Sequence, residues 1–270
     1  MSAKKRILFI ANEMSPYVEL TDFADTINKL AVKSNESGME VRCIMPRFGV
    51  INERRHRLHE VVRLSGINVS INGDDFPLMI KVASLPNARL QVYFLDNEDY
   101  FKRKTVFTDE QDNWHDDNGI RTALFCKGAL ETVKKFGWPP DLIHCSGWMT
   151  GLIPMFIKTA YKKEPVFSNS KVIYTIGQNT FKEKLGTDFS KLISINDHVS
   201  KKELEFFKDH NNAAMFRGGA AYADAITFGA SKVDKKLVEE FSKVKGKKTL
   251  LYNEESDLTD YLQLYADLAK

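Results

Sequence analysis

The segment "RILFIANEMSPYVELTDFAD" (residues 6–25) decides the expected fold. Its first part is an apolar run typical of a buried β-strand, and its second part leads into a helix. A strand, a short loop and a helix often bind phosphate, because the helix N-terminus is partly positive and glycines let the backbone approach the anion. This loop has no glycine and offers Glu19, Thr21 and Asp22 instead. It therefore has the position of a phosphate loop but the wrong charge for a phosphate.

Further apolar runs alternate with helical patterns along the chain. These runs are rich in Val and Ile, as expected for strands buried on both faces of a parallel sheet, and they cover residues 39–45, 141–145, 171–176 and 224–228. Two amphipathic helices are predicted between them, one beginning at Phe23 and stopped by Gly38, the other over 120–137 and stopped by Gly137. The alternation predicts an α/β fold, a Rossmann-like doubly wound parallel sheet.

Residues 65–96 interrupt this alternation. They contain three extended runs separated by the dipeptides Asn72-Gly73 and Pro86-Asn87. Such dipeptides are typical of tight turns between antiparallel strands. We therefore predict an antiparallel hairpin excursion that rejoins the parallel sheet near "QVYFLD" (91–96).

The composition is that of a globular protein, with 43% hydrophobic and 28% charged residues in a chain of 270. The net charge of +3 is too balanced to indicate nucleic-acid binding. A basic cluster, "NERRHRLHE" (52–60), is the one local exception, and a solvated helix face or loop explains it better than phosphate contact. We expect no nucleic-acid partner.

Three cysteines, Cys43, Cys126 and Cys145, are far apart and lie in apolar surroundings. This pattern argues against a disulfide framework and against a metal site, and it is typical of reduced thiols in the cytosol. The apolar run that begins at Arg6 is too short for a signal peptide or a membrane span. We therefore expect a cytoplasmic protein with no membrane contact.

Seven segments resemble, in the same order, the N-terminal half of bacterial glycogen and starch synthases of glycosyltransferase family 5. They are "ANEMSPYVELTDFAD" (11–25), "IMPRFG" (44–49), "FLDNEDYFKR" (94–103), "DNGIRTALFCKGALE" (117–131), "PDLIHCSGWMTGLIP" (140–154), "VIYTIGQN" (172–179) and "GGAAYADAIT" (218–227). The resemblance covers about residues 5 to 235. It implies one half of a two-domain GT-B fold, in enzymes that transfer glucose from a sugar nucleotide, usually ADP-glucose, to the end of an α-1,4-glucan.

The phosphate loop departs from the family. Where the family has Lys-Thr-Gly-Gly-Leu-Ala-Asp, this chain has "ELTDFAD" (19–25). The family's lysine contacts the sugar-nucleotide phosphates, and Glu19 reverses its charge. A carboxylate about 4 Å from a phosphate repels it by roughly 1 kcal/mol in water and about 4 kcal/mol at intermediate screening. We interpret this as a degenerate donor site, in which Thr21 or Asp22 caps the helix and no donor phosphate binds.

Two other loops lack the histidines that the resemblance implies. After residues 141–145 the family has His-Asp-Trp-His, and this chain has Ser-Gly-Trp148-Met149. Met149 replaces a histidine of the sugar-transfer site and cannot hold a proton. After the next strand the family's Thr-Ile-His-Asn appears as Thr-Ile-Gly177-Gln178, so a second cleft histidine is absent. We therefore expect no catalytic residue in this chain.

One pattern of the glucan side of the cleft is retained. Asp117, Asn118 and Arg121 match the family's Asp-Asn-x-x-Arg at the start of a helix, and with Trp148 they are the candidate glucan-cleft residues. The residues alone also allow Asp117 to be a helix N-cap and Arg121 its partner one turn on. His144 matches a buried position, and we expect a hydrogen-bonded core histidine there.

A GT-B enzyme needs a second domain, and too few residues follow position 230 to form it. The end of the chain, "DLTDYLQLYADLAK" (257–270), resembles the last helix of the same synthases, which packs back on the N-terminal domain. We therefore predict a GT-B half over 1–235 and C-terminal helices over 236–270 that pack on it. On this interpretation the second domain was lost and the helix that covers the first domain was kept. We would then expect the chain to be a finished protein and not a broken fragment.

These observations favour a non-catalytic homologue of the family that acts in glucan metabolism. It would need no cofactor and no metal, and it would bind an α-glucan, a maltooligosaccharide or a protein partner such as a glycosyltransferase. The alternative is the acceptor half of a split ADP-glucose-dependent α-1,4-glucan glucosyltransferase, which would be an enzyme only with a partner chain. A nucleotide-binding regulatory module is disfavoured by Glu19 and by the lack of a G-x-G-x-x-G or P-loop sequence.

Overall fold

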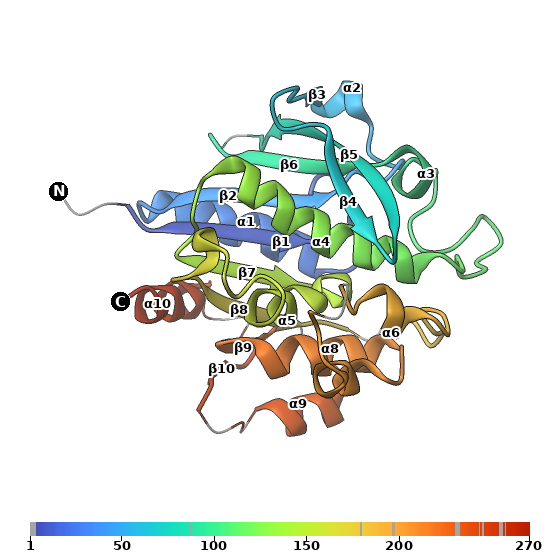
Figure 1. Cartoon of the computed structure of the whole chain (residues 1–270). Helices are drawn as coiled ribbons and strands as arrows, with labels where there is room; N and C mark the ends of the chain where they lie inside the picture. The colour runs from blue at the N-terminus through green and yellow to red at the C-terminus, as the bar shows by residue number, and fades with distance from the viewer. Residues whose placement is uncertain are drawn as a thin grey trace.

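The computed structural model shows an α/β protein in which one mostly parallel sheet has helices on both faces (Figure 1). It describes residues 4–86, 88–178, 180–195, 198–229, 233–242, 244, 246–253, 256 and 258–270. The strands are β1 (Arg6–Ala11), β2 (Glu40–Pro46), β3 (His59–Glu60), β4 (Ile67–Ile71), β5 (Asp74–Ser84), β6 (Gln91–Asp96), β7 (Leu142–Ser146), β8 (Lys171–Ile176), β9 (Ala225–Phe228) and β10 (Lys248–Leu250). The Rossmann-like fold class predicted from the sequence is confirmed.

The helices include four long ones and several short turns. The α-helices are α1 (Phe23–Glu36), α2 (Glu53–His56), α3 (Glu98–Phe101), α4 (Asn118–Phe136), α5 (Leu152–Lys158), α6 (Phe189–Leu192), α7 (Lys201–Leu204), α8 (Asn212–Tyr222), α9 (Lys235–Phe241) and α10 (Thr259–Leu268). Helices α1 and α4 begin and end close to the predicted positions. Gly38 and Gly137 follow them with φ of 96° and 59°, the left-handed conformation that ends a helix.

The sheet has the strand order β10-β9-β8-β7-β1-β2-β6-β5-β3, with β4 paired to β5. Strand β1 lies between β2 and β7 and is parallel to both. Its residues from Ile7 to Ala11 are buried, as the apolar run predicted. The carboxyl ends of β1, β7, β8 and β2 therefore share one edge, at the right of Figure 1.

The predicted antiparallel excursion is confirmed. Strand β5 is antiparallel to β4 and to β6, and β6 rejoins the sheet parallel to β2. Asn72 and Gly73 connect β4 to β5 with φ of 53° and 92°, the two left-handed residues that a tight hairpin turn requires. The second turn begins at Pro86, and its partner in the predicted dipeptide, Asn87, lies outside the described residues.

Helices α4, α5 and α8 pack together on one face of the sheet, whereas α1 and α10 pack together on the other. The helices that connect β6 to β7, β7 to β8 and β8 to β9 include α4, α5 and α8, and these three lie on the same face of the sheet. The opposite face of β7, β8 and β9 is therefore not covered by these connections. Tyr261, Leu264 and Tyr265 of α10 are buried and fill that space. The C-terminal helix is thus part of the core, although its Leu268 is only partly buried.

The sequence did not predict β10. This strand has three residues, is largely polar, and pairs in parallel with β9 at the end of the sheet. Lys247, just before it, donates hydrogen bonds of 2.6–2.8 Å to the carbonyls of Ala220, Ala221 and Ala223 at the end of α8. A cation there offsets the unpaired carbonyls of the helix end.

His144 joins α10 to the sheet. Its Nδ1 lies 2.6 Å from the Tyr265 hydroxyl and its Nε2 lies 2.6 Å from Thr175 Oγ1, which in turn lies 2.6 Å from Thr227 Oγ1. The ring is fully buried, and burial lowers the pKa of His144 to about 3. The expected hydrogen-bonded core histidine is therefore confirmed.

This burial predicts how stability depends on pH. Above pH 6.5 His144 is neutral in both states, whereas below it the unfolded chain binds a proton that the folded chain excludes until about pH 3. The free energy of unfolding should therefore fall between pH 6.5 and 3 by up to about 1.4 kcal/mol per pH unit from this residue. Urea denaturation of the wild type and of His144→Asn should show a shallower pH slope in the variant, and equal slopes would contradict the prediction.

Candidate functional site

A pocket of about 480 Å³ opens at the carboxyl edge of the sheet. Asn12 and Glu13 at the end of β1 line it, together with the loops that begin at Gly147 after β7 and at Gly177 after β8. The loop before α4 closes it through Phe107 and other residues. The pocket therefore lies where α/β proteins with an open parallel sheet usually bind their ligands.

Aromatic rings form one wall of the pocket. Phe181 stacks on Trp114 with ring centroids 4.5 Å apart and meets Trp148 edge-on at 4.7 Å. Phe107 lies 4.8 Å from Trp148 on the other side. Trp148 is only 3% exposed, but Trp114 and Phe107 are half-buried and present ring surface to a ligand.

The polar groups of the pocket carry negative or no charge. Glu13 and Glu183 are its carboxylates, and the described lining residues include no lysine or arginine. Two buried lining atoms, Asn12 Oδ1 and Trp114 Nε1, have no hydrogen-bond partner in the structure. Both atoms have almost no accessible surface, so the polar groups open to the pocket are uncharged ones such as Gln178 and Thr180, together with the two carboxylates.

Gly147 allows Asn12 to lie in the pocket. It has a φ of 86°, and a side chain there would place Cβ 1.9 Å from Asn12 Oδ1. The family that the sequence resembles has an aspartate at the position of Gly147. The absence of a side chain at this position in the present chain leaves the space that Asn12 occupies. Substitution of this glycine would displace Asn12 from the pocket wall.

The loop before α1 is organised by Glu13. Glu13 Oε2 accepts hydrogen bonds from the backbone N–H groups of Leu20 at 2.8 Å and Thr21 at 2.7 Å, and Oε1 accepts from Thr21 Oγ1 at 2.7 Å. Burial raises the pKa of this carboxyl group, although the three hydrogen bonds oppose the shift. Glu13 therefore joins the end of β1 to the loop before α1.

The three acidic-loop residues singled out in the sequence have different surroundings. Glu19 accepts from Ser15 Oγ at 2.6 Å and lies with Thr21 and Asp22 around a second hollow, which shares Leu20 and Thr21 with the pocket. Thr21 also accepts from Phe23 N–H at 3.2 Å, so it caps α1 as predicted. Asp22 occupies the N-cap position of α1, but its side chain makes no capping bond.

The positions that match the family's histidines separate in the structure. Gly177, which matches one histidine, lines the pocket together with its neighbour Gln178. Met149, which matches the other, does not line it, because its side chain is fully buried in the core. Its backbone carbonyl accepts from Cys126 Sγ at 2.9 Å. Met149 therefore acts in packing and presents no group to the pocket.

The candidate glucan-cleft residues are only partly accessible. Arg121 has no exposed surface, and it donates to the carbonyls of Tyr100 at 2.7 Å and Val106 at 2.6 Å and to Asn118 Oδ1 at 2.6 Å. Burial lowers its pKa to about 10. Its guanidinium thus bonds the loop around the pocket, and its contact with a glucan stays a prediction.

Asp117 and Asn118 support the same loop. Asp117 forms a two-pronged ion pair with Arg103 rather than with Arg121, and it makes no side-chain cap bond to α4. Asp117 does occupy the N-cap position of α4, as the residues allowed, and its carbonyl accepts from Arg121 N–H at 3.0 Å, but its carboxylate bonds Arg103. Asn118 is buried, and its Nδ2 donates to the carbonyl of Phe107 at 2.8 Å. It thereby positions a ring of the pocket.

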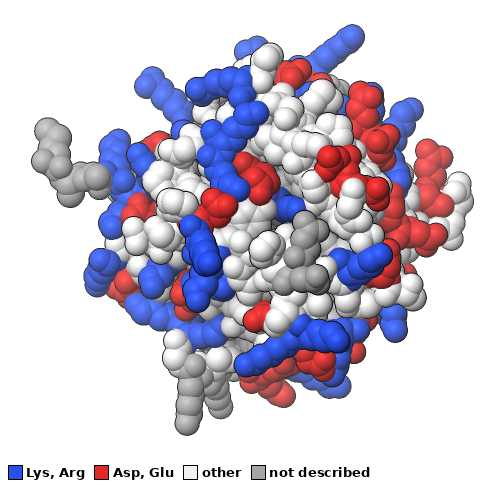
Figure 2. All heavy atoms as spheres, viewed as in Figure 1, with Lys and Arg blue, Asp and Glu red and all other residues white. Residues whose placement is uncertain are grey.

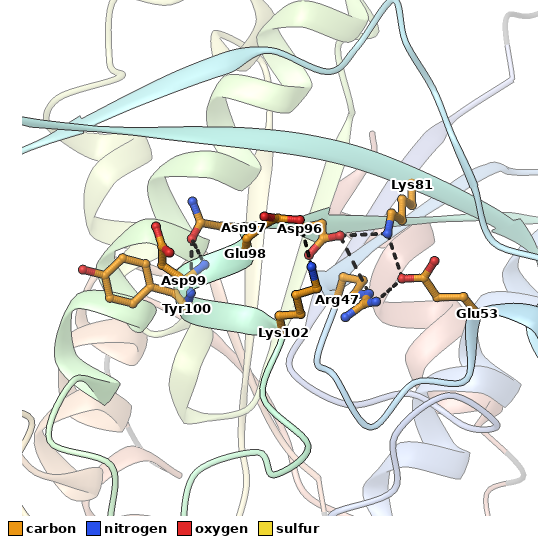
Figure 3. Close-up of polar contacts among 9 residues, drawn as sticks. All are labelled: Arg47, Glu53, Lys81, Asp96, Asn97, Glu98, Asp99, Tyr100 and Lys102. Carbon is orange, nitrogen blue, oxygen red and sulfur yellow. Dashed lines mark hydrogen bonds and ion pairs between the residues drawn. The ribbon is translucent and has the colours of Figure 1, made fainter.

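A four-residue charge cluster lies at the ends of β2 and β6, beyond the described lining of the pocket (Figure 3). Lys81 Nζ lies 2.7 Å from Glu53 Oε1 and 2.9 Å from Asp96 Oδ2, and Arg47 pairs with both carboxylates. Burial would lower the pKa of Lys81, but its two partners outweigh burial and raise the pKa. The cluster joins the loop that follows β2 to β5 and β6.

Acidic side chains gather along the right-hand edge of the molecule, where the loop between α3 and α4 projects (Figures 1 and 2). This loop contributes Asp109, Glu110, Asp112 and Asp116. The edge of the pocket is therefore acidic, as its lining is.

Within the described parts of the chain, no cluster of His, Cys, Asp and Glu has the arrangement of a metal site. No described helix is both long and apolar enough to cross a membrane.

A family model described as "Starch synthase catalytic domain" matches residues 6–251. The chain belongs to this family. Glycogen synthases of Chlorobium limicola and Chlorobium luteolum are 36% and 39% identical to it over 225 residues, which is 82% of this chain and 45% of each relative. This member of the starch synthase family thus spans about half the length of the curated relatives it matches, and it matches their N-terminal half.

The fold agrees with this assignment. The catalytic domain of starch synthase IV from Arabidopsis thaliana, solved bound to ADP and acarbose, superposes with a TM-score of 0.71 at 16% identity. The match covers 98% of this chain and 50% of that structure. At this identity the comparison establishes the fold alone, which is that of one half of this GT-B catalytic domain.

Sequence reasoning missed three residues of the site. Glu13 follows the first strand and precedes a loop without glycine. A carboxylate at that point in the sequence could have indicated a residue that bonds the loop. Asn12 gave no signal of its own. Phe181 lies in an irregular loop after β8, where no periodic pattern marks the side chains that face the pocket.

Proposed function

We propose that this chain binds the end of a neutral α-1,4-glucan in the pocket at the carboxyl edge of the sheet and does not transfer glucose on its own. The observation that carries the proposal is the lining of the pocket, which combines aromatic rings with uncharged polar groups and two carboxylates. Membership of the starch synthase family supports a role in glucan metabolism.

The aromatic wall suits a sugar. Trp114 and Phe107 offer apolar ring faces, and Gln178 and Thr180 add uncharged polar side chains to the lining. A few placed polar groups on an apolar surface are typical of small-molecule sites. A glucose unit has one apolar face and several hydroxyl groups, so it matches both features.

The pocket is poorly suited to a sugar nucleotide. A diphosphate would meet Glu13 and Glu183 with no described cation in the lining to offset them. The family's sugar-transfer histidine corresponds to Met149, which is buried and has no proton to give. The pocket thus lacks a cation to bind the sugar-nucleotide donor, and it lacks the histidine that would carry a proton. Together these two absences among the described residues support a non-catalytic role.

The tryptophans provide a direct binding assay. Trp114 and Trp148 line the pocket, whereas Trp138 lies elsewhere and donates to Glu40 at 2.6 Å. In a Trp138→Phe background, maltotetraose should change the fluorescence, and Trp114→Ala should weaken binding by at least about tenfold, or about 1.4 kcal/mol. No change at about 10 mM maltotetraose, with a folded protein, would contradict glucan binding.

A split transferase is the second candidate, because the chain covers only 45% of its glycogen synthase relatives. In that case a partner, such as a second glycosyltransferase domain, would supply the donor site. Incubation of the purified chain with ADP-glucose and a glucan primer separates the two. We expect no extension, and extension by this chain alone would contradict the non-catalytic proposal.

We also propose that residues 1–235 form the GT-B half and residues 236–270 its C-terminal cover, and that the protein acts in the cytoplasm. Limited proteolysis tests the division. A stable fragment ending near residue 235 that keeps the wild-type melting temperature would contradict the role of the last segment as a cover.

A further inference from the structure

We propose that Arg54, Arg55 and Arg57 form a second binding site, which takes phosphate esters carried by the glucan. The inference deepens the proposed function and rests on it for the identity of the polymer, whereas the phosphate follows from the arginines themselves. The three residues belong to the basic segment "NERRHRLHE" (52–60), which contributes nothing to the lining of the pocket.

The three arginines are exposed, and their side chains make no hydrogen bond or ion pair with any described residue. Basic side chains project at the top of Figure 2, where α2 and β3 lie in Figure 1. The carboxylates of the segment do not neutralise them, because Glu53 is paired with Lys81 and Arg47 and Glu60 is the one carboxylate left. The segment therefore presents a net positive charge to the solvent.

The cations of this surface are arginines and not lysines. The chain has 28 lysines and 11 arginines, yet residues 52–63 contain four arginines and no lysine. A guanidinium group binds a phosphate through two parallel hydrogen bonds, whereas a lysine acts as a point charge. The sequence alone favoured a solvated surface here, but unpaired arginines of this number fit a phosphate-binding site better.

The backbone that carries the arginines is held from its inner side. Glu53 accepts from Lys81 Nζ at 2.7 Å, within the charge cluster of Figure 3. His56 meets Tyr17 edge-on, with ring centroids 4.9 Å apart, and Leu58 packs against the core. The arginines therefore project from a fixed support, which lowers the entropy that a ligand must overcome.

The arginines and the pocket lie on the same edge of the sheet. Helix α2 follows the carboxyl end of β2, and Tyr17, which contacts α2, lies three residues before Leu20 of the pocket lining. A glucan whose end occupies the pocket can therefore reach both sites with one chain.

The charge of this edge favours scattered phosphate groups over a continuous polyanion. The loop between α3 and α4 places Asp109, Glu110, Asp112 and Asp116 on the same edge, which is acidic in Figure 2. A nucleic acid carries a phosphate on every nucleotide, so it would meet these carboxylates as well as the arginines. A neutral polysaccharide with occasional phosphate esters can place its charged groups on the arginines alone.

The experiment uses surface plasmon resonance to compare amylopectin that carries phosphate monoesters with the same amylopectin after phosphatase treatment. The wild type should bind the phosphorylated polymer at least about tenfold more tightly, because several arginines and several esters act together. Arg54→Gln/Arg55→Gln/Arg57→Asn should bind both polymers equally. Asparagine is used at position 57 because Arg57 has a φ of 55°, a conformation that asparagine adopts readily. Equal binding by the wild type, or a preference that survives the triple substitution, would overturn the proposal.

The matched control is Lys162→Gln/Lys163→Gln/Lys171→Gln, which removes three exposed cations between α5 and the first residue of β8. It should keep the wild-type preference, and the same loss in both triple variants would show an effect of net charge and overturn the proposal. A DNA oligonucleotide at the same phosphate concentration should bind more weakly than the phosphorylated polymer. Tighter binding of the DNA would assign the arginines to nucleic acid instead.

Maltotetraose, which has no phosphate, is titrated separately into the wild type and the arginine variant. Both should bind it equally, because the arginines do not line the pocket. A wild type that ignores maltotetraose but prefers the phosphorylated polymer would contradict the proposed function and leave the phosphate site standing. Loss of maltotetraose binding in the arginine variant would overturn the assignment of the arginines to a separate site.

Discussion

A chain truncated after residue 258 is expected to lose its cooperative thermal unfolding transition. Truncation removes α10, whose Tyr261, Leu264 and Tyr265 are buried against the sheet, and it exposes the far side of β7 and β8. Truncating one large buried aromatic residue costs about 3–5 kcal/mol, and the whole fold is stabilised by only about 5–15 kcal/mol. Differential scanning calorimetry of the truncated and full chains measures the effect directly.

Tyr265→Phe is the matched control for this truncation. It keeps the buried ring but removes the hydroxyl that pairs with His144 Nδ1, so the free energy of unfolding should fall by about 1–3 kcal/mol with the transition still cooperative. A peptide of residues 259–270 should restore the transition of the truncated chain when added in excess. A truncated chain that melts like the wild type would show that α10 adds nothing to the core.

The second large effect is expected at Lys81. Lys81→Met removes the cation that contacts Glu53 and Asp96, and the Asp96 side chain is only 5% exposed. A buried carboxylate that loses its partner costs about 3 kcal/mol or more, and Arg47 at 3.8 Å offsets only part of that loss. Urea denaturation at pH 7 should show the decrease in the free energy of unfolding.

The chain offers a surface ion pair as the control for Lys81. Lys102 and Glu98 are paired at 2.9 Å in α3, with side chains 58% and 66% exposed. Lys102→Met should change the free energy of unfolding by less than about 0.5 kcal/mol. Adding Asp96→Asn to Lys81→Met should recover part of the loss, since the neutral amide no longer needs a cation. Equal effects of the two lysine substitutions would contradict the role assigned to the buried cluster.

The fold could be predicted where each residue type has one favourable environment. The apolar run of β1 and the stripe of α1 bury the side chains that hydrophobicity selects, and Asn72-Gly73 adopts the left-handed turn that these residues favour. The short strand β10 could not be predicted, because three largely polar residues carry no periodic signal and the pairing with β9 is decided by tertiary contact.

The site was less predictable than the fold, because polar side chains have several possible partners. Arg121 matched a cleft pattern, yet its guanidinium bonds backbone carbonyls inside the protein. The sequence pointed to Glu19 as the acidic residue that decides the character of the loop, yet the carboxylate that bonds the loop backbone is that of the buried Glu13. Spacing in the sequence gives the element on which a residue lies, but the hydrogen-bond partner depends on loops that meet only in the folded chain.

The start of β1 and the end of α10 lie on the side of the molecule away from the pocket. Figure 1 shows both of them at the left, whereas the strand ends that line the pocket lie at the right. An affinity handle on either end would therefore orient immobilised molecules with the aromatic wall facing the solution. The same arrangement lets long, branched polysaccharides be tested on a sensor surface without obstruction from the linker.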